Sequence, residues 1–123
     1  MAYDNQNIFA KIIRGEIPCD KVFEDDHVLA FNDINPARPV HILVIPKGPY
    51  ESMDDFSAKA SADEQAAFIK AIGHVAREAG VADSGYRVIS NTGEHGHQEV
   101  PHLHIHVLGG AFSGPMVKRM EKM

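Results

Sequence analysis

Polar and apolar residues alternate most sharply between residues 102 and 108, where the chain is His-Leu-His-Ile-His-Val-Leu. A period of two is the side-chain period of a β-strand. We therefore predict a strand with His102, His104 and His106 on one face, looking into a cleft, and the intervening apolar residues on the core side. Five of the eight histidines lie between residues 95 and 106, so this strand is the first candidate for a functional site.

Four further runs of β-prone residues are short and are separated by turn-forming residues. These runs are residues 21–24, 28–32, 40–45 and 86–91. The first two flank Asp25-Asp26, which predicts a hairpin. The third run is apolar almost throughout, so it is expected to be a central strand of the sheet.

Two stretches follow the helical period instead. The longer begins at Ser61, where Glu64 three residues later completes a capping box, and it ends at Gly80. Between these residues, apolar positions recur at spacings of three and four and form one stripe. A shorter amphipathic helix is predicted over residues 7–15, which begin with asparagine and end with glycine.

Together these elements predict an α+β fold with a five-stranded antiparallel sheet, one long helix and one short N-terminal helix. Antiparallel pairing is expected because most links are short, and the long helix should cover the apolar face of the histidine strand. The 123 residues are expected to form a single domain, 1–123, with residues 111–123 as a variable C-terminal tail. Within that tail we predict one further turn, over residues 116–120.

Composition narrows the classes of function. The formal charge is −5 and no cluster of lysine and arginine is present, so binding to nucleic acid is not expected. No leader sequence and no apolar run of roughly 18 residues is found, which predicts a cytoplasmic protein without a membrane partner. The single cysteine, Cys19, lies beside acidic residues and is interpreted as an incidental thiol.

The histidine row has two chemical interpretations. Imidazole binds zinc, but same-face neighbours on a strand are about 6.7 Å apart and the outer pair about 13 Å apart, so one ion cannot bind all three. A third ligand would come from His41, His95 or His97, with Glu99 also available. Alternatively, a neutral imidazole attacks phosphorus while a second one offsets developing charge on oxygen.

Several segments then point to a known family. Residues 102–108 resemble the signature of the histidine triad (HIT) superfamily of nucleotide hydrolases and transferases. Residues 7–18, 31–36 and 41–47 resemble the branch called histidine triad nucleotide-binding proteins. The likeness extends from about residue 5 to residue 110, and the order and spacing of the segments agree.

This resemblance implies a HIT-like fold and a purine nucleoside phosphoramidase, which splits the P–N bond between AMP and an amine. By this likeness His104 is the nucleophile that becomes adenylylated, and His106 contacts the phosphate and helps the leaving group. His102 and His41 orient and tune His104. The family's chemistry needs no metal and no cofactor.

The resemblance also implies the nucleotide contacts and the assembly. Asp33 would bind the ribose hydroxyls. The phosphate and ribose region would be lined by Asn91, Glu99 and Val100, and the base pocket by Phe9, Ile17, Phe31 and Ile34. Expected partners are a purine nucleotide substrate (AMP, GMP or adenosine phosphoramidates) and a second copy, in a homodimer whose long helices and histidine-side strands meet at a two-fold axis.

Two alternative functions stay open, and the sequence departs from the family pattern at two positions. The alternatives are a dinucleoside polyphosphate hydrolase of the same superfamily and a non-catalytic module that binds nucleotide or zinc. Many close members of the branch have a small hydroxyl residue in place of Glu99 and a glycine in place of His97. A carboxylate beside a phosphate adds repulsion unless it is protonated, turned away or paired.

Overall fold

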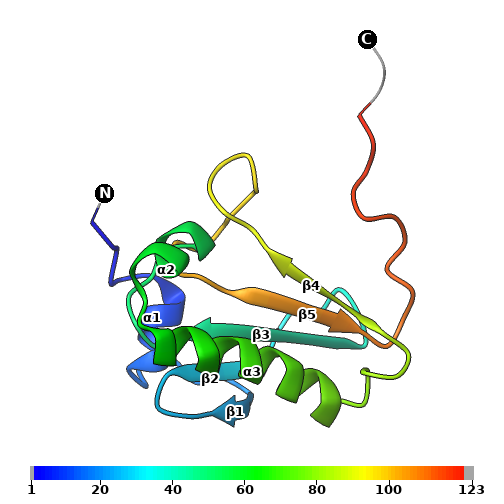
Figure 1. Cartoon of the computed structure of the whole chain (residues 1–123), viewed down its shortest axis with the longest axis horizontal. Coiled ribbons are helices and arrows are strands. Elements are labelled where there is room, and N and C mark those ends of the chain that lie inside the picture. Colours follow the sequence, from blue (N-terminus) through cyan, green and yellow to red (C-terminus); the bar gives the residue numbers. More distant parts are fainter. Residues whose placement is uncertain (1, 121–123) are drawn as a thin grey trace.

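The computed structural model describes residues 2–120. Five strands form one antiparallel sheet in the order β1-β2-β3-β5-β4. Their bounds are β1 Lys21–Glu24, β2 Val28–Asn32, β3 Val40–Pro46, β4 Tyr86–Ser90 and β5 Ile105–Gly109. The helices are α1 Ile8–Ile13, α2 Met53–Lys59 and α3 Ala62–Glu78 (Figure 1). The predicted α+β class and antiparallel sheet are confirmed.

The two predicted helices begin and end where the local signals place them. Asn7 caps α1, with its side chain accepting from the amide of Ala10. Ser61 caps α3, and the reciprocal hydrogen bonds of a capping box with Glu64 are both present. Gly80 follows α3 with φ +77°, a left-handed conformation that glycine adopts at little cost.

Helix α2 was not predicted from the sequence. Helix α2 has seven residues, capped by Ser52, and buries Phe56 in the core beside Phe68. Its signals are a serine followed three residues later by Asp55, whose amide donates to the serine Oγ, and a lysine in the last turn. A seven-residue segment offers too few turns for apolar periodicity to appear, so the hydrophobic pattern alone could not identify it.

Strand β5 begins three residues later than predicted, so His102 and His104 precede the strand and only His106 lies within it. The register of β3 and β5 pairs Val44 with Ile105, and continuing it would place Pro46 opposite Leu103. A proline has no N–H to donate to the ladder. The amide of Leu103 donates instead to the carbonyl of Tyr50, at 2.8 Å.

The sheet has two different faces. On one face α3 packs through Phe68, Ala71 and Val75 against the sheet-side core residues Val28, Ala30, Ile42, Val44, Leu103, Ile105 and Val107. On the other face α1 packs through Phe9 against Leu29, Phe31, Leu43 and Ile45. The predicted packing of the histidine segment's apolar side on the long helix is therefore confirmed, and Figure 1 shows α3 lying against the sheet, nearly along the direction of its strands.

The segment after β5 has no regular secondary structure through residue 120, so the turn predicted over 116–120 is wrong. Its backbone is nevertheless anchored. The guanidinium of Arg87 donates to the carbonyls of Ser113, Gly114 and Pro115, and Arg38 also donates to Ser113. Within residues 2–120, no helix combines the length and the apolar character required to cross a membrane.

Candidate active site

The triad histidines lie on the α1 side of the sheet, but at different depths. His102 has no exposed surface, His104 is 8% exposed, and His106 is partly exposed. The expectation that all three rings look outward into a cleft is therefore wrong for His102. This ring lies beneath the site, in edge-to-face contact with Tyr3 and Phe9.

His102 is held by hydrogen bonds on both ring nitrogens. Its Nε2 lies 2.8 Å from the carbonyl oxygen of Pro46, which can only accept, so Nε2 carries the proton. Its Nδ1 then accepts from the hydroxyl of Tyr3, whose oxygen in turn accepts from the side-chain amide of Asn7. Burial lowers the pKa of His102 to about 4, so the ring is neutral at pH 7.

His104 is oriented by the backbone of the same segment. Its Nδ1 lies 2.7 Å from the carbonyl oxygen of His102 and therefore donates, which leaves the lone pair on Nε2. Burial, with the ring of Phe9 at a centroid distance of 4.9 Å, lowers the pKa of His104 below its usual value. A neutral imidazole with a free, fixed Nε2 is suited to nucleophilic attack.

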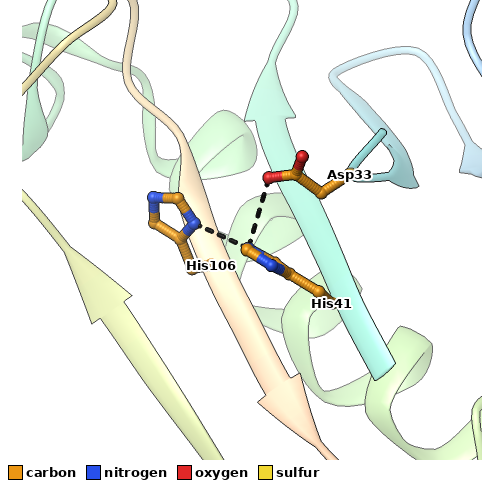
Figure 2. A group of neighbouring side chains, drawn as sticks. All are labelled: Asp33, His41 and His106. Atoms are coloured by element: carbon orange, nitrogen blue, oxygen red, sulfur yellow. Dashed lines mark hydrogen bonds and ion pairs between the residues drawn. The ribbon is translucent and has the colours of Figure 1, made fainter. Parts of the chain in front are cut away.

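His41 and His106 form a directed pair with Asp33, drawn in Figure 2. They meet because Leu43 pairs with His106, which makes His41 a diagonal neighbour of His106 on the same face. The amide of Ala37 donates to His41 Nδ1 at 3.0 Å, so the proton of neutral His41 is on Nε2.

The Nε2–H of His41 points to His106 Nδ1, with the two nitrogens 2.9 Å apart. Asp33 Oδ2 lies 3.4 Å from the same Nε2 of His41. His106 therefore accepts at Nδ1 and keeps its own proton on Nε2. Burial, followed by the neighbouring His104 and His41, lowers the pKa of His106 to about 4, and burial also lowers the pKa of His41. The site thus presents an N–H donor on His106, whose ring lies at a centroid distance of 5.1 Å from that of His104.

Asp33, His41 and His106 place ligand atoms within 4.8 Å of one another, which is close enough for a metal ion. Tetrahedral zinc requires ligand atoms about 3.3 Å apart, and the spacing here is similar. The amide of Ala37 opposes this use, because zinc at His41 Nε2 would force the proton onto Nδ1, against another donor. Of the other nitrogen ligands considered, His95 and His97 are exposed on the loop and do not join this group.

An apolar pocket of about 370 Å³ opens beside the histidines. All four residues expected around the base line it, namely Phe9, Ile17, Phe31 and Ile34. Asp33, Glu99 and Val100 line it as well, whereas Asn91 follows β4 and is not part of the lining. None of the triad histidines lines this pocket or a larger groove of about 570 Å³ between α3 and β1. The 370 Å³ pocket is the one that adjoins them, because its wall residue Phe9 contacts the ring of His104 and its wall residue Asp33 lies 3.4 Å from His41.

Several residues of the site were missed from the sequence. Ile8, Ile12 and Leu43 line the pocket, and the spacing of the first two along one helix face was a usable signal. Cys19, interpreted as incidental, also contributes to the wall, and burial raises the pKa of its thiol. Tyr3 carried no signal, because its contact with His102 spans 99 positions of the chain.

The fold has counterparts in known proteins. Residues 14–113 match the model of the HIT domain family, and the chain belongs to that family. The resemblance drawn from the sequence motifs is thereby confirmed.

Three relatives illustrate the match. An uncharacterised 13.2 kDa HIT-like protein of Azospirillum brasilense is 61% identical over 117 residues, covering 95% of this chain and 96% of its own. Purine nucleoside phosphoramidase of Escherichia coli (strain K12) is 48% identical over 114 residues, covering 91% and 93%. Among solved structures, a HIT family hydrolase from Clostridium thermocellum superposes with a TM-score of 0.85 at 40% identity, covering 94% and 99%. The chain is therefore a HIT protein similar to hydrolases.

Proposed function

We propose that this protein is a nucleoside phosphoramidase that splits the P–N bond between a purine nucleoside monophosphate and an amine through a covalent nucleotidyl-His104 intermediate. The observation that carries the proposal is the fixed tautomer of His104, whose Nδ1 donates to the carbonyl of His102 and whose Nε2 is free. The similarity to the Escherichia coli phosphoramidase supports the same reaction.

The first step transfers the nucleotidyl group to the protein. A bond forms between His104 Nε2 and phosphorus as the P–N bond breaks. The leaving nitrogen takes the electron pair of that bond and a proton from water at the pocket mouth. The Nε2–H of His106 donates to a phosphoryl oxygen, where a preorganised donor is worth more than in bulk water. His41 keeps that donor in place by occupying the other nitrogen of His106.

The second step returns His104 to its starting state. Water attacks phosphorus, the bond from phosphorus to Nε2 breaks, and one proton of the water passes to solvent. The products are the nucleoside monophosphate and neutral His104. The hydrogen bond to the carbonyl of His102 is kept throughout, so the ring does not reorient between the steps.

The pocket accounts for the nucleoside part of the substrate. The base would be enclosed by Phe9, Ile17, Phe31 and Ile34, which offer apolar and aromatic surface. Asp33 also lines the pocket, and its carboxylate oxygens have lone pairs left to accept from the ribose hydroxyls. Asn91 lies outside the pocket lining, and its role in binding stays a prediction.

We further propose that the protein works as a homodimer. Strand β4 is one of the two edge strands of the sheet, and its Tyr86 and Val88 are 40% and 45% exposed. Ile69 on α3 is 66% exposed. Covering an unpaired strand edge and neighbouring apolar side chains is a common reason for self-association. Sedimentation equilibrium tests this assembly.

The cytoplasmic location stays a prediction.

The decisive experiment is mass spectrometry after rapid quenching with an AMP phosphoramidate. We expect one nucleotidyl group on the peptide that contains residues 102–106, and its loss in His104→Ala. The exposed His95→Ala should retain the modification. Turnover without any mass increase would contradict covalent catalysis, and full activity after chelation and dialysis would contradict the zinc alternative.

A further inference from the structure

The charges around the nucleoside pocket are one-sided. Two carboxylates, Asp33 and Glu99, line it, and none of its lining residues within the described chain is lysine or arginine. The nearby imidazoles do not compensate, because burial lowers the pKa values of His104 and His106. A pocket of this charge accepts one phosphoryl group through N–H donors but offers no cation for additional phosphates.

Glu99 lines the pocket next to Val100 and is close enough to His104 and His106 for its charge to act on them. Its side chain is 75% exposed, and within residues 2–120 its one hydrogen-bonding or ionic partner is His97, with Nε2 3.0 Å from Oε1. The carboxylate is therefore paired on one side and open to a ligand and to solvent on the other.

The loop holds Glu99 in this place. The neighbouring Gln98 donates to the carbonyls of Glu51 and Val100 and accepts from the amide of Gly93. His97 has a φ of +59°, a left-handed conformation that costs a residue with a side chain about 1 kcal/mol. Glu99 is thus presented by an anchored loop that keeps a histidine where glycine would fit more easily.

The path of the leaving group follows from in-line displacement. The nucleophile His104 is 8% exposed and the nucleoside occupies the apolar pocket, so the departing group has to leave on the solvent side of phosphorus. Glu99 and His97 are strongly exposed and lie next to that pocket, so they border the exit.

We propose that Glu99, with His97 as its hydrogen-bonding partner, determines substrate specificity by favouring nucleoside phosphoramidates whose amine part carries a further positive charge. The same carboxylate disfavours leaving groups that extend as polyphosphate. The inference rests on the proposed function and adds the class of leaving group to it.

The test compares two AMP phosphoramidates of matched length. One carries a 4-aminobutyl amine with a free ammonium group, and the other carries an uncharged pentyl amine. The measured quantity is the ratio of kcat/KM for the cationic over the uncharged substrate. We expect wild type to favour the cationic substrate and Glu99→Gln to lower the ratio about fivefold, the range of one exposed ion pair.

Two further variants sharpen the result. Glu94→Gln removes the same charge from the same loop but outside the pocket lining, and should leave the ratio unchanged. His97→Gly removes the hydrogen-bonding partner of Glu99, which leaves the carboxylate free for the ammonium group, and should raise the ratio about twofold. Because the carboxylate is exposed, the preference should also shrink in 1 M salt. Diadenosine tetraphosphate should be a poor substrate of wild type and a better one of Glu99→Gln.

The outcomes separate the two proposals. A ratio that is the same in wild type and Glu99→Gln, with both substrates turned over, overturns the role of Glu99 and leaves the phosphoramidase proposal standing. An equal drop in Glu94→Gln overturns it too, because general loop charge then explains the preference. If wild type turns over neither phosphoramidate, the proposed function fails and the inference fails with it.

Discussion

The two faces of the sheet use the same strands for different purposes. Toward α3, alternate residues of β2, β3 and β5 are apolar and closely packed, and Phe68, Val44 and Val107 are completely buried. Toward α1, the other residues of the same strands include His41 and His106, together with Phe31 and Leu43, which line a pocket of about 370 Å³. The α3 face contributes mainly to the stability of the fold, whereas the α1 face buries the polar side chains of the candidate active site.

The comparison shows how a reactive face can be kept ordered. Polar rings on the α1 side are not left unpaired, since His102, His104 and His41 each bond a backbone group. A satisfied polar network is rigid, whereas an unsatisfied one is costly. Substitutions on the α1 face should therefore affect turnover most, and substitutions on the α3 face should affect stability most.

The largest expected effect is on chemistry at the α1 face. His104→Ala should reduce turnover of an AMP phosphoramidate by at least about 10⁴-fold, because it removes the nucleophile and not one acid–base group. Steady-state assays measure it, and circular dichroism should show an unchanged fold. Near-normal turnover would show that another residue attacks phosphorus.

On the opposite face the large effect should be on stability. Phe68 is fully buried between α3 and the sheet, so Phe68→Ala is expected to lower the free energy of unfolding by about 3–5 kcal/mol. Urea denaturation measures the change, and the exposed Lys70→Ala on the same helix is the control. Activity per folded molecule should stay close to wild type, and a selective loss of activity would mean that the faces are coupled.

Stability should fall when the solution becomes acidic. The pKa of His102 is about 4 in the folded chain and about 6.5 when unfolded, so between these values only the unfolded chain binds the proton. Stability is therefore complete above pH 6.5 and is lost as the pH falls toward 4, by about 3 kcal/mol from this residue. Denaturation at pH 7 and pH 4.5 measures the slope. His102→Gln should reduce this slope and leave the part that comes from His106, whereas the exposed His95→Gln should leave the slope unchanged.

The smallest effect concerns the support beneath the site. Tyr3→Phe removes the donor to His102 Nδ1 and the acceptor for Asn7, and should cost about 1–2 kcal/mol in unfolding free energy. We expect turnover to fall less than tenfold, since the tautomer of His104 is set by a backbone carbonyl instead. Thermal denaturation and kinetics on the same sample test this. A loss as large as that of His104→Ala would place Tyr3 in the chemistry.

Much of the fold was predictable because local signals and burial agree. The bounds of β1 and β2 and the capping of α3 followed from turn residues, alternation and the capping box. Helix α2 was not predictable from periodicity, because its seven residues have only Phe56 buried. The start of β5 is set by its pairing with β3, where the register would place Pro46 opposite Leu103 and Pro46 has no N–H to donate. Residues 102–104 carry no signal of this limit.

The site was predictable in its residues more than in its environment. The motif and the flanking segments pointed to the histidines and to four of the apolar residues that line the pocket, Phe9, Ile17, Phe31 and Ile34. The depth of His102 could not be inferred, because it depends on Tyr3 and Phe9 folding over it. The pairing of Glu99 with His97 was one of several open arrangements, and only the loop conformation selects it.

Three backbone groups assign the ring protons: the N–H of Ala37 and the carbonyls of Pro46 and His102. Every residue has a carbonyl, and every residue except proline has an N–H. Evolution can therefore replace the side chains at positions 37 and 46 without rewriting the proton arrangement, provided that the path of the chain survives. Of these replacements, only proline at position 37 would change it. Proline would remove the N–H that donates to His41 Nδ1 and so keeps the proton of His41 on Nε2, facing His106.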